Sequence, residues 1–453
     1  MILSAEIILP VSYLPILNAA ILIENGRIRD IGIKDEIINR YRSHELMEFK
    51  DAALMPGLIN LHAHLELTAL KGRIFNEDTE LMHWILRLVD EKKATSAEVI
   101  SSGSEKGITE AISTGTTTIS DISTNGESLY KLKKTGIRGI VYKELLNFDD
   151  TKALSYWKKA IEDIESLRKD ETALLSIGIS PHSPYSVSPR LLGLIQGYAE
   201  KENLKLTMHV SESREEIKFI SEDKGPIKDI YLKRFKWDKY KRQVFGDCKS
   251  PVEYLEKEGL LSPEFLLVHG VHLNNDDIKR LARKGVPVVH CPRSNVFIGV
   301  GVAPFYNLIS EGITVGLGTD SCASNYTLNM WDEMRFAYLL HNRINDKKIT
   351  AEDIIMAATI NGAKALGLDD KTGTIEIGKE ADIIAVRFPK RDTDICPVRK
   401  QAPSEPHKTC NPLKDEFSNG VYRDLLLHTV PNDIIMTMVA GKVIYQKELK
   451  DVN

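Results

Sequence analysis

The sequence predicts an α/β protein: a (β/α)8 barrel of the TIM type, with a small β-sandwich domain built from both ends of the chain. Three observations lead to this prediction. Eight short apolar runs alternate with amphipathic segments through the middle of the chain, as parallel strands and their crossover helices do. Strand-like segments stand at both ends. At 453 residues, the chain is also longer than one ordinary domain.

The N-terminal part of the β domain is expected over residues 1–55. It contains three strand-like segments and an Asn25-Gly26 pair that favours a tight hairpin. The segments are Ala5–Leu9, Ala20–Glu24 and Arg27–Ile33. The proline and glycine of Met55-Pro56-Gly57 then break the pattern and mark the end of this part.

The barrel is expected over residues 56–366, where strand-like and helix-like segments alternate. The eight candidate strands are Leu58–Leu61, Thr116–Ser120, Ile137–Val141, Leu174–Ile179, Leu206–Val210, Leu266–Val268, Val286–Val289 and Thr314–Leu317. The candidate helices are Ala97–Ser113, Ala153–Leu167, Pro189–Lys201, Asp276–Lys284, Pro304–Glu311 and Ala351–Leu366.

Residues 367–453 return to strands and turns and are expected to complete the β domain. The strand-like segments here are Thr372–Glu376, Ala381–Val386, Ile434–Val439 and Val443–Tyr445. Two charge-rich stretches fit no regular element, namely Lys218–Gly259 and Pro389–Asn432. Insertions of this length are usually lids, binding loops or mobile segments.

The composition predicts a soluble cytoplasmic protein. A formal net charge of −4 offers no basic surface for nucleic acid or an anionic membrane. No uninterrupted apolar stretch is long enough to span a bilayer, and the apolar N-terminus lacks the basic start of a signal peptide. Five scattered cysteines without a Cys-x-x-Cys pair fit a reducing compartment. They are Cys248, Cys291, Cys322, Cys396 and Cys410.

Candidate metal ligands stand at the carboxyl ends of four predicted strands. His62 and His64 are two residues apart on the first strand, so both imidazoles point to one face. His209, His269 and Asp320 end or follow the fifth, sixth and eighth strands. In a barrel these ends meet at one mouth. Neutral imidazoles with one carboxylate suit Zn²⁺, or alternatively Fe²⁺, so we expect one divalent ion.

Glu212 is the candidate proton carrier. It lies three residues after His209, where the strand gives way to a loop. A carboxylate there could take a proton from water and deliver it to a ring nitrogen. The alternative is that Glu212 is one of several solvated charges in the run from Glu212 to Glu216.

Taken together, these motifs resemble the amidohydrolase superfamily over nearly the whole chain. The matching segments are residues 56–64, 209–212, 268–273, 290–295, 318–325 and 372–382. Within the superfamily, the His-x-x-Glu of residues 209–212 and the Thr-Asp-Ser-x-Ala-Ser-Asn of residues 319–325 are similar to the branch of chlorohydrolases and 5′-substituted adenosine deaminases.

The resemblance implies a role for each residue. His62, His64, His209 and Asp320 would bind one metal ion, and Asp320 would also take a proton from the water. His269 would hydrogen-bond the water or polarise the intermediate, and Glu212 would shuttle the proton and contact the substrate. The fourth strand ends in Ser180-Pro181-His182, without the lysine that binuclear relatives carry, so a single metal is expected.

Two further residues are candidates for substrate contact. His182, in Ser180-Pro181-His182-Ser183-Pro184-Tyr185, resembles a segment that meets the substrate in adenosine-type deaminases. Its alternative is a loop histidine locked between prolines. Trp84 follows the first strand, where relatives place a helix near the pocket, and its alternative is a packed helix-face aromatic. Cys291 and Cys322 are interpreted as packing residues.

The predicted function is deamination of a purine nucleoside, with methylthioadenosine, S-adenosylhomocysteine and aminofutalosine as candidate substrates. The Lys218–Gly259 stretch, with Tyr231, Phe235, Trp237 and Tyr240, would form a lid over the 5′ substituent or an oligomer contact. A small N-heterocyclic substrate and a second copy of the chain are the expected partners. Two alternatives stay open: a chlorohydrolase or cyclic amide hydrolase, and a non-catalytic scaffold that would have lost its metal ligands.

Overall fold

The computed structural model describes residues 1–74, 80–235, 244–344, 347–388 and 412–447. It divides into two compact units. One unit comprises Met1–Ile59, Glu110–Thr118 and Asn329–Asn453, and the other comprises Asn60–Thr109 and Ile119–Leu328. The predicted domain boundaries after residues 55 and 366 stay a prediction.

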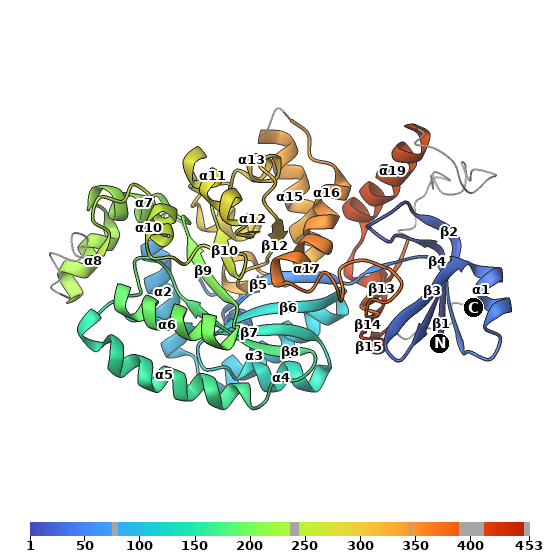
Figure 1. The fold of residues 1–453 in the computed structure, drawn as a ribbon, viewed down its shortest axis with the longest axis horizontal. Coiled ribbons are helices and arrows are strands. Elements are labelled where there is room, and N and C mark those ends of the chain that lie inside the picture. Colours follow the sequence, from blue (N-terminus) through green and yellow to red (C-terminus); the bar gives the residue numbers. More distant parts are fainter. Residues whose placement is uncertain (75–79, 236–243, 345–346, 389–411, 448–453) are drawn as a thin grey trace. The chain divides into compact units, whose positions relative to one another are not determined.

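An eight-stranded sheet in the order β12-β11-β10-β9-β8-β7-β6-β5 confirms the predicted barrel (Figure 1). Its strands are β5 (Leu58–Ala63), β6 (Thr116–Ser123), β7 (Arg138–Leu145), β8 (Leu175–Pro181), β9 (Leu206–Val210), β10 (Phe265–His269), β11 (Val288–His290) and β12 (Val315–Leu317). Most of their residues are buried, as expected for parallel strands covered on both faces.

Side-chain and backbone bonds join the two ends of this sheet. The Asn60 side chain accepts a hydrogen bond from the backbone N–H of Thr319 at 3.1 Å and donates one to its hydroxyl at 2.8 Å. The backbone N–H of Asp320 donates to the carbonyl of His62 at 2.8 Å, within a parallel bridge between Ala63 and Asp320. The first strand and the loop after the last strand are therefore held together.

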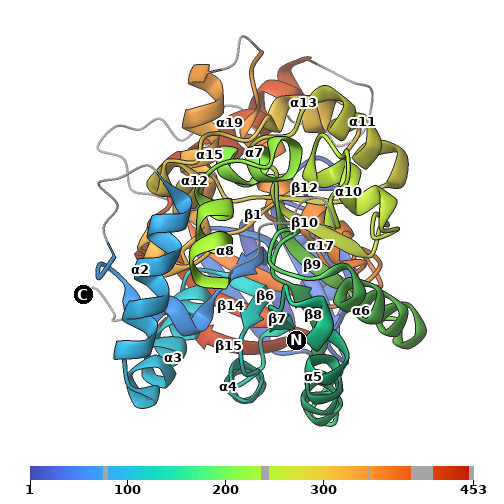
Figure 2. The same cartoon turned by 90° about the vertical axis from the view of Figure 1, so that its left-hand side faces the viewer.

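Helices cover the outside of the strands. Figure 2 shows α3 (Ala97–Ser113), α4 (Ser128–Thr135), α5 (Ala153–Arg168) and α6 (Pro189–Glu202) around β6, β7 and β8. In α5, Trp157, Ala160, Ile164 and Leu167 are buried at helical spacing, which is the apolar stripe that the sequence pattern predicted. The predicted helices over residues 276–284 and 304–311 correspond to α11 (Asn275–Lys284) and α13 (Phe305–Ser310).

A second, mixed sheet has the order β15-β14-β13-β4-β1-β2-β3. Its strands are β1 (Ile2–Ile8), β2 (Ile16–Glu24), β3 (Arg27–Ile33), β4 (Leu46–Pro56), β13 (Ile383–Arg387), β14 (Ile434–Val439) and β15 (Lys442–Gln446). Because β13 pairs with β4, segments from both ends of the chain form one sheet, as predicted. β4 was not predicted, since Glu48, Lys50 and Asp51 interrupt its apolar pattern until Ala52.

The prediction that residues 218–259 and 389–432 fit no regular element is wrong where the structure describes them. Helices α7 (Arg214–Glu222), α8 (Pro226–Phe235), α10 (Pro251–Lys257) and α19 (Pro412–His428) occupy these stretches. In α7 and α10 short buried apolar stripes lie among charged residues. Trp237 and Tyr240 of the predicted lid lie outside the described residues, as do Cys396 and Cys410. Thr372–Glu376 forms no strand.

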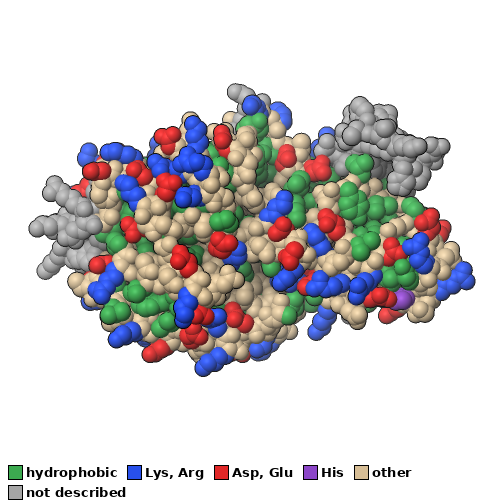
Figure 3. All heavy atoms as spheres, viewed as in Figure 1, with side chains coloured by type: hydrophobic (Ala, Val, Ile, Leu, Met, Phe, Trp, Pro, Cys, Tyr) green, Lys and Arg blue, Asp and Glu red, His purple; other side chains and the backbone are tan. Residues whose placement is uncertain are grey.

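The predicted helix over residues 351–366 is two helices, α16 (Ala351–Ala357) and α17 (Ile360–Leu366), with the backbone broken at Thr359. No described helix is long and apolar enough to cross a membrane. On the face shown in Figure 3, lysine and arginine side chains lie among aspartate and glutamate side chains, in keeping with the small net charge.

Candidate metal centre

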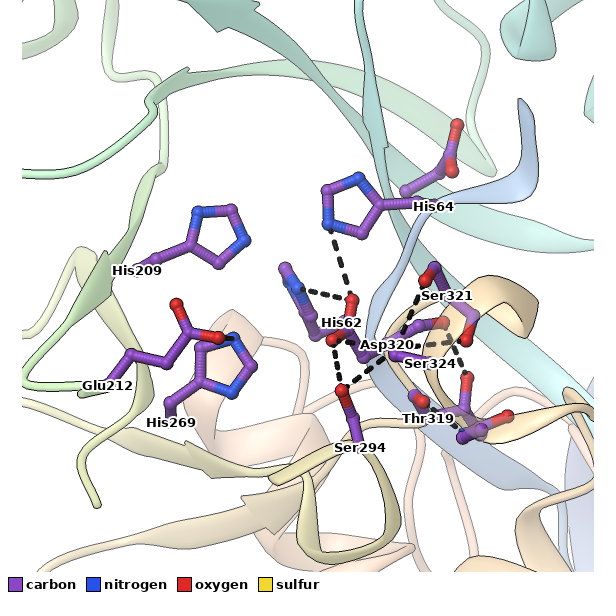
Figure 4. Close-up of polar contacts among 12 residues, drawn as sticks. His62, His64, His209, Glu212, His269, Ser294, Thr319, Asp320, Ser321 and Ser324 are labelled. Carbon is purple, nitrogen blue, oxygen red and sulfur yellow. Dashed lines mark hydrogen bonds and ion pairs between the residues drawn. The ribbon is translucent and has the colours of Figure 1, made fainter. Parts of the chain in front are cut away.

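His62 and His64 reach the same carboxylate oxygen. His62 lies within β5 and is fully buried, and His64 follows the strand. The Nε2 atom of each imidazole is 3.5 Å from Oδ1 of Asp320 (Figure 4). This separation exceeds that of a good hydrogen bond. Both imidazoles therefore face Asp320 without bonding strongly to it.

His209 approaches these two imidazoles from β9. Its ring centroid is 5.0 Å from that of His62 and 5.6 Å from that of His64. Its Nδ1 is 2.9 Å from the carbonyl oxygen of His182, to which only a protonated nitrogen can donate. This bond fixes the tautomer and leaves Nε2 as the atom with a free lone pair.

Asp320 has one carboxylate oxygen held by hydroxyl groups and the other facing the histidines. Oδ2 accepts from the hydroxyl of Ser294 at 2.5 Å and from that of Ser324 at 3.2 Å. Ser294 and Ser324 are fully buried. The backbone of Asp320 has φ +58°, a left-handed conformation that costs a non-glycine residue about 1–3 kcal/mol. Oδ1 is thereby aimed at the imidazoles.

These donors fit a divalent cation. Potential ligand atoms of His62, His64 and Asp320 lie within 4.8 Å of one another, and so do those of His62, His209 and His269. Two ligands each about 2.1 Å from one tetrahedral ion lie about 3.4 Å apart, close to the 3.5 Å separations from Asp320. Neither ring nitrogen of buried His62 has a hydrogen-bond partner among the described residues, and a bound metal ion would give one of the two nitrogens a partner.

His269 and Glu212 face each other beside this group. His269 ends β10 with φ +73°, and its Nδ1 donates to Oδ1 of Asn295 at 2.9 Å. Its Nε2 is then 3.6 Å from Oε1 of Glu212, whose side chain is 11% exposed. Figure 4 shows His209, Glu212 and His269 on the side of the group opposite Ser321. A metal, a proton carrier and a hydrogen-bonding imidazole can thus act on one molecule.

Burial sets the protonation states needed for metal binding. It lowers the pKa of His62, lowers that of His64 to about 3, and lowers that of His209 well below its usual range. These imidazoles are therefore neutral at physiological pH, as ligation requires. Burial raises the pKa of Glu212. Burial alone would raise the pKa of Asp320, but His62, His64 and His269 outweigh it and hold that pKa well below the usual range.

The two predicted substrate-contact residues differ in their surroundings. The Nδ1 of His182 is 2.9 Å from the hydroxyl of Ser186, and its ring centroid is 5.0 Å from that of His209. Trp84, on α2 (Leu81–Ala94), is only 5% exposed and packs in an apolar cluster with Leu67 and Val271. His182 therefore lies beside the metal-site histidines, whereas the Trp84 ring is mostly packed. Cys291 and Cys322 are fully buried, as their interpretation as packing residues implied.

The sequence interpretation missed the residues that orient the site. Ser294, Asn295 and Ser324 hold Asp320 and His269, and Glu216 contacts the backbone of Glu212. A usable signal existed for the first three, because they lie in residues 290–295 and 318–325, two of the segments that carry the family resemblance. No spacing rule distinguishes Glu216 from the charged residues around it.

The chain is similar to known proteins over most of its length. A model of the amidohydrolase family matches residues 53–231 and 236–444. The 5-methylthioadenosine/S-adenosylhomocysteine deaminase of Thermococcus sibiricus is 32% identical over 440 residues, which cover 95% of this chain and 90% of that protein. The 5′-deoxyadenosine deaminase of Methanobrevibacter smithii is 31% identical over 375 residues, 82% of this chain and 80% of that protein.

Among solved structures, an adenosine deaminase from Xanthomonas campestris with bound zinc superposes with a TM-score of 0.78 at 25% identity. The match covers all of this chain and 94% of that one.

Proposed function

Since the chain belongs to the amidohydrolase family, we propose that it is a metal-dependent aminohydrolase that deaminates a purine nucleoside. The candidate substrates are methylthioadenosine, S-adenosylhomocysteine and aminofutalosine. The names of the two relatives support the first two and add 5′-deoxyadenosine. The observation that carries the proposal is that three histidines and one aspartate meet next to Glu212 and His269.

We propose that His62, His64, His209 and Asp320 hold one cation, with Zn²⁺ as the main candidate and Fe²⁺ as the alternative. Nitrogen ligands with one carboxylate suit zinc, and the similar Xanthomonas deaminase has bound zinc. When bound, such an ion acts as a Lewis acid that lowers the pKa of water from about 15.7 toward 7 and makes hydroxide available at neutral pH.

The protein's own groups would then move the protons. Glu212 takes a proton from the attacking water and passes it to a ring nitrogen, which makes the amine-bearing carbon electrophilic. The water oxygen bonds to that carbon. Asp320 then accepts the second proton of the water and passes it to the amino group, so that the C–N bond breaks and ammonia leaves. Burial raises the pKa of Glu212 above its ordinary value, which favours a group that both accepts and donates a proton. His269, with Nδ1 committed to Asn295, offers Nε2 to the oxygen.

Two residues would contact the rest of the substrate. His182 would use Nε2, because Ser186 and Ser183 lie within hydrogen-bonding distance of Nδ1. Trp84 would use its indole N–H, which is buried and has no hydrogen-bond partner among the described residues. The cytoplasmic location and the homo-oligomeric state remain predictions from the sequence.

Metal analysis and a substrate panel test the proposal. The purified protein should contain about one zinc or iron per chain and release ammonia from at least one of the four 5′-modified adenosines. Absence of ammonia from these, adenosine, guanine and cytosine would reject it. Release of chloride or alkylamine from a triazine, or opening of a cyclic amide, would favour the alternative hydrolase. A protein without metal or turnover would be a scaffold, although the full ligand set argues against that.

A further inference from the structure

The carboxylate of Glu212 is held through its backbone and not through its side chain. Nε2 of His269 lies 3.6 Å from Oε1 of Glu212, and among the described residues the Glu212 carboxylate accepts no hydrogen bond. The preceding residue, Ser211, has φ +54°. The backbone N–H of Glu212 donates to Oε2 of Glu216 at 2.9 Å. Where the Glu212 carboxylate points therefore depends on this backbone and on Glu216.

The contact is a helix cap displaced by one residue. Ser213 is the N-cap of α7, and its hydroxyl accepts the N–H of Glu216 at 3.2 Å. In an ordinary capping box, the third helical residue returns its side chain to the N–H of the N-cap itself. Asp277 does this to Asn274 in α11, and so does Asp353 to Thr350 in α16. The longer Glu216 passes Ser213 and reaches Glu212.

Among the described residues, the same displaced cap also starts α10. In α10, the hydroxyl of Ser250 accepts the N–H of Glu253 at 3.1 Å, and Oε2 of Glu253 accepts the N–H of Lys249 at 2.7 Å. Glu253 is 22% exposed and pairs with Lys257 at 3.4 Å. A displaced cap alone is thus an ordinary helix start, and α10 provides a control for what such a cap does without a catalytic neighbour.

Glu216 differs from Glu253 in ways that helix capping does not require. It is 1% exposed, it forms no ion pair among the described residues, and its Oε1 has no hydrogen-bond partner there. Burial raises the pKa of Glu216 to about 8. Burying a carboxyl group with one oxygen unsatisfied is unfavourable. Ser213 already caps the helix, so the remaining contribution of Glu216 is its contact with the backbone of Glu212 and of the preceding Ser211.

We propose that Glu216 is a positioning residue for deamination: its carboxyl group fixes the backbone of Glu212 so that the Glu212 carboxylate faces His269 and the substrate. This inference rests on the proposed function, in which Glu212 carries the proton. Loss of the bond lets the loop between β9 and α7 relax, and a misplacement of about 1 Å is enough to lower a rate about a hundredfold.

The test uses three variants of the intact metal-loaded protein and one 5′-modified adenosine that it deaminates. Glu216→Asp shortens the side chain by one methylene, so that it reaches Ser213 in an ordinary box, as in α11, and no longer reaches Glu212. Glu216→Gln keeps an acceptor oxygen at the original reach. Glu253→Asp makes the same shortening in α10, away from the site. Each variant is measured for kcat, KM, melting temperature and metal content.

We expect Glu216→Asp to lower kcat about 10- to 100-fold, with KM changed less than threefold and metal content unchanged. Glu216→Gln should recover most of that loss, and Glu253→Asp should match the wild-type kcat. Wild-type kcat in Glu216→Asp would overturn the inference, as would equal losses in Glu216→Asp and Glu253→Asp. If Glu216→Asp fails to fold, the test depends on folded Glu216→Gln. A tenfold lower kcat in Glu216→Gln then overturns the inference, and a kcat near the wild-type value supports it. Full activity of Glu212→Gln would instead refute the proposed function itself.

Discussion

Substitution of Ser294 by alanine should weaken metal binding, although Ser294 is not a proposed ligand. Its hydroxyl donates to Oδ2 of Asp320 at 2.5 Å, a short distance typical of a bond to an ionised carboxylate. The substitution removes this bond and leaves Oδ2, among the described residues, with the longer hydrogen bond from Ser324 at 3.2 Å. Since Asp320 is 6% exposed, water would not easily replace the lost donor.

The magnitude follows from the chemistry of that bond. A hydrogen bond to a charged group contributes about 1.5–3 kcal/mol. Its loss weakens the free energy of metal binding, because Asp320 must stay ionised and oriented to bind the ion. Ser324 remains, so the lower half of the range applies. We expect about 1.5–2.2 kcal/mol, which corresponds to a dissociation constant roughly 10- to 40-fold higher.

Competition with a chelator of known zinc affinity measures this change directly. Ser321→Ala is the matched control, because Ser321 lies 3.0 Å from the hydroxyl of Ser324 and has no hydrogen bond to Asp320. It should change the dissociation constant less than threefold. If Ser294→Ala binds zinc within twofold of the wild type, Asp320 is either not a ligand or not oriented by this hydroxyl.

Three further outcomes are expected. Gly318→Ala would place a Cβ 2.7 Å from Cβ of His62, so it should destabilise the fold by about 1–3 kcal/mol in denaturant titration and lower metal content; a wild-type result would contradict the packing described. Burial raises the pKa of Asp121 to about 7, above its unfolded value of 3.8. The folded state therefore keeps this proton over a pH range in which the unfolded state has lost it. The stabilisation is fully present below about pH 4, and the free energy of unfolding falls as pH rises from about 4 to 7, by at most about 1.4 kcal/mol per pH unit. Asp121→Asn should accordingly show a flatter decline in melting temperature between pH 4 and 7, and an unchanged slope would refute the assignment. Chelation should lower the melting temperature and added zinc should restore it, because an ion that binds only the folded state stabilises it. His62→Ala should abolish this response.

The sequence predicted the barrel well because its strands are buried on both faces. Such strands are continuous apolar runs, and the polar residues that interrupt them, such as His209 and Asp320, stand at their ends. The spacing of His62 and His64 was weak evidence by itself, and the predicted metal site depended on His209, His269 and Asp320 standing at other strand ends. β4 was missed because its first half is exposed and charged, so that it lacks this pattern. Helices α7 and α10 were missed because their short apolar stripes lie in charged sequence.

The sequence drew attention to the segments that orient the site, but not to which of their atoms meet the site residues. A serine, an asparagine and a glutamate hold Asp320, His269 and Glu212 by single hydrogen bonds. Polar residues near a strand end are common, and which of them meet depends on side-chain rotamers and on loop conformation. Periodicity carries information about faces and ends, and it says nothing about those distances.

The left-handed backbones of His269 and Asp320 have a consequence for how this protein can change. Glycine adopts such angles without strain, so replacing either residue with glycine would relieve backbone strain while deleting a side chain that the chemistry needs. Selection for folding stability and selection for catalytic activity would therefore favour different residues at these two positions. A thermostable variant obtained without an activity screen would be expected to lose its chemistry at these positions early.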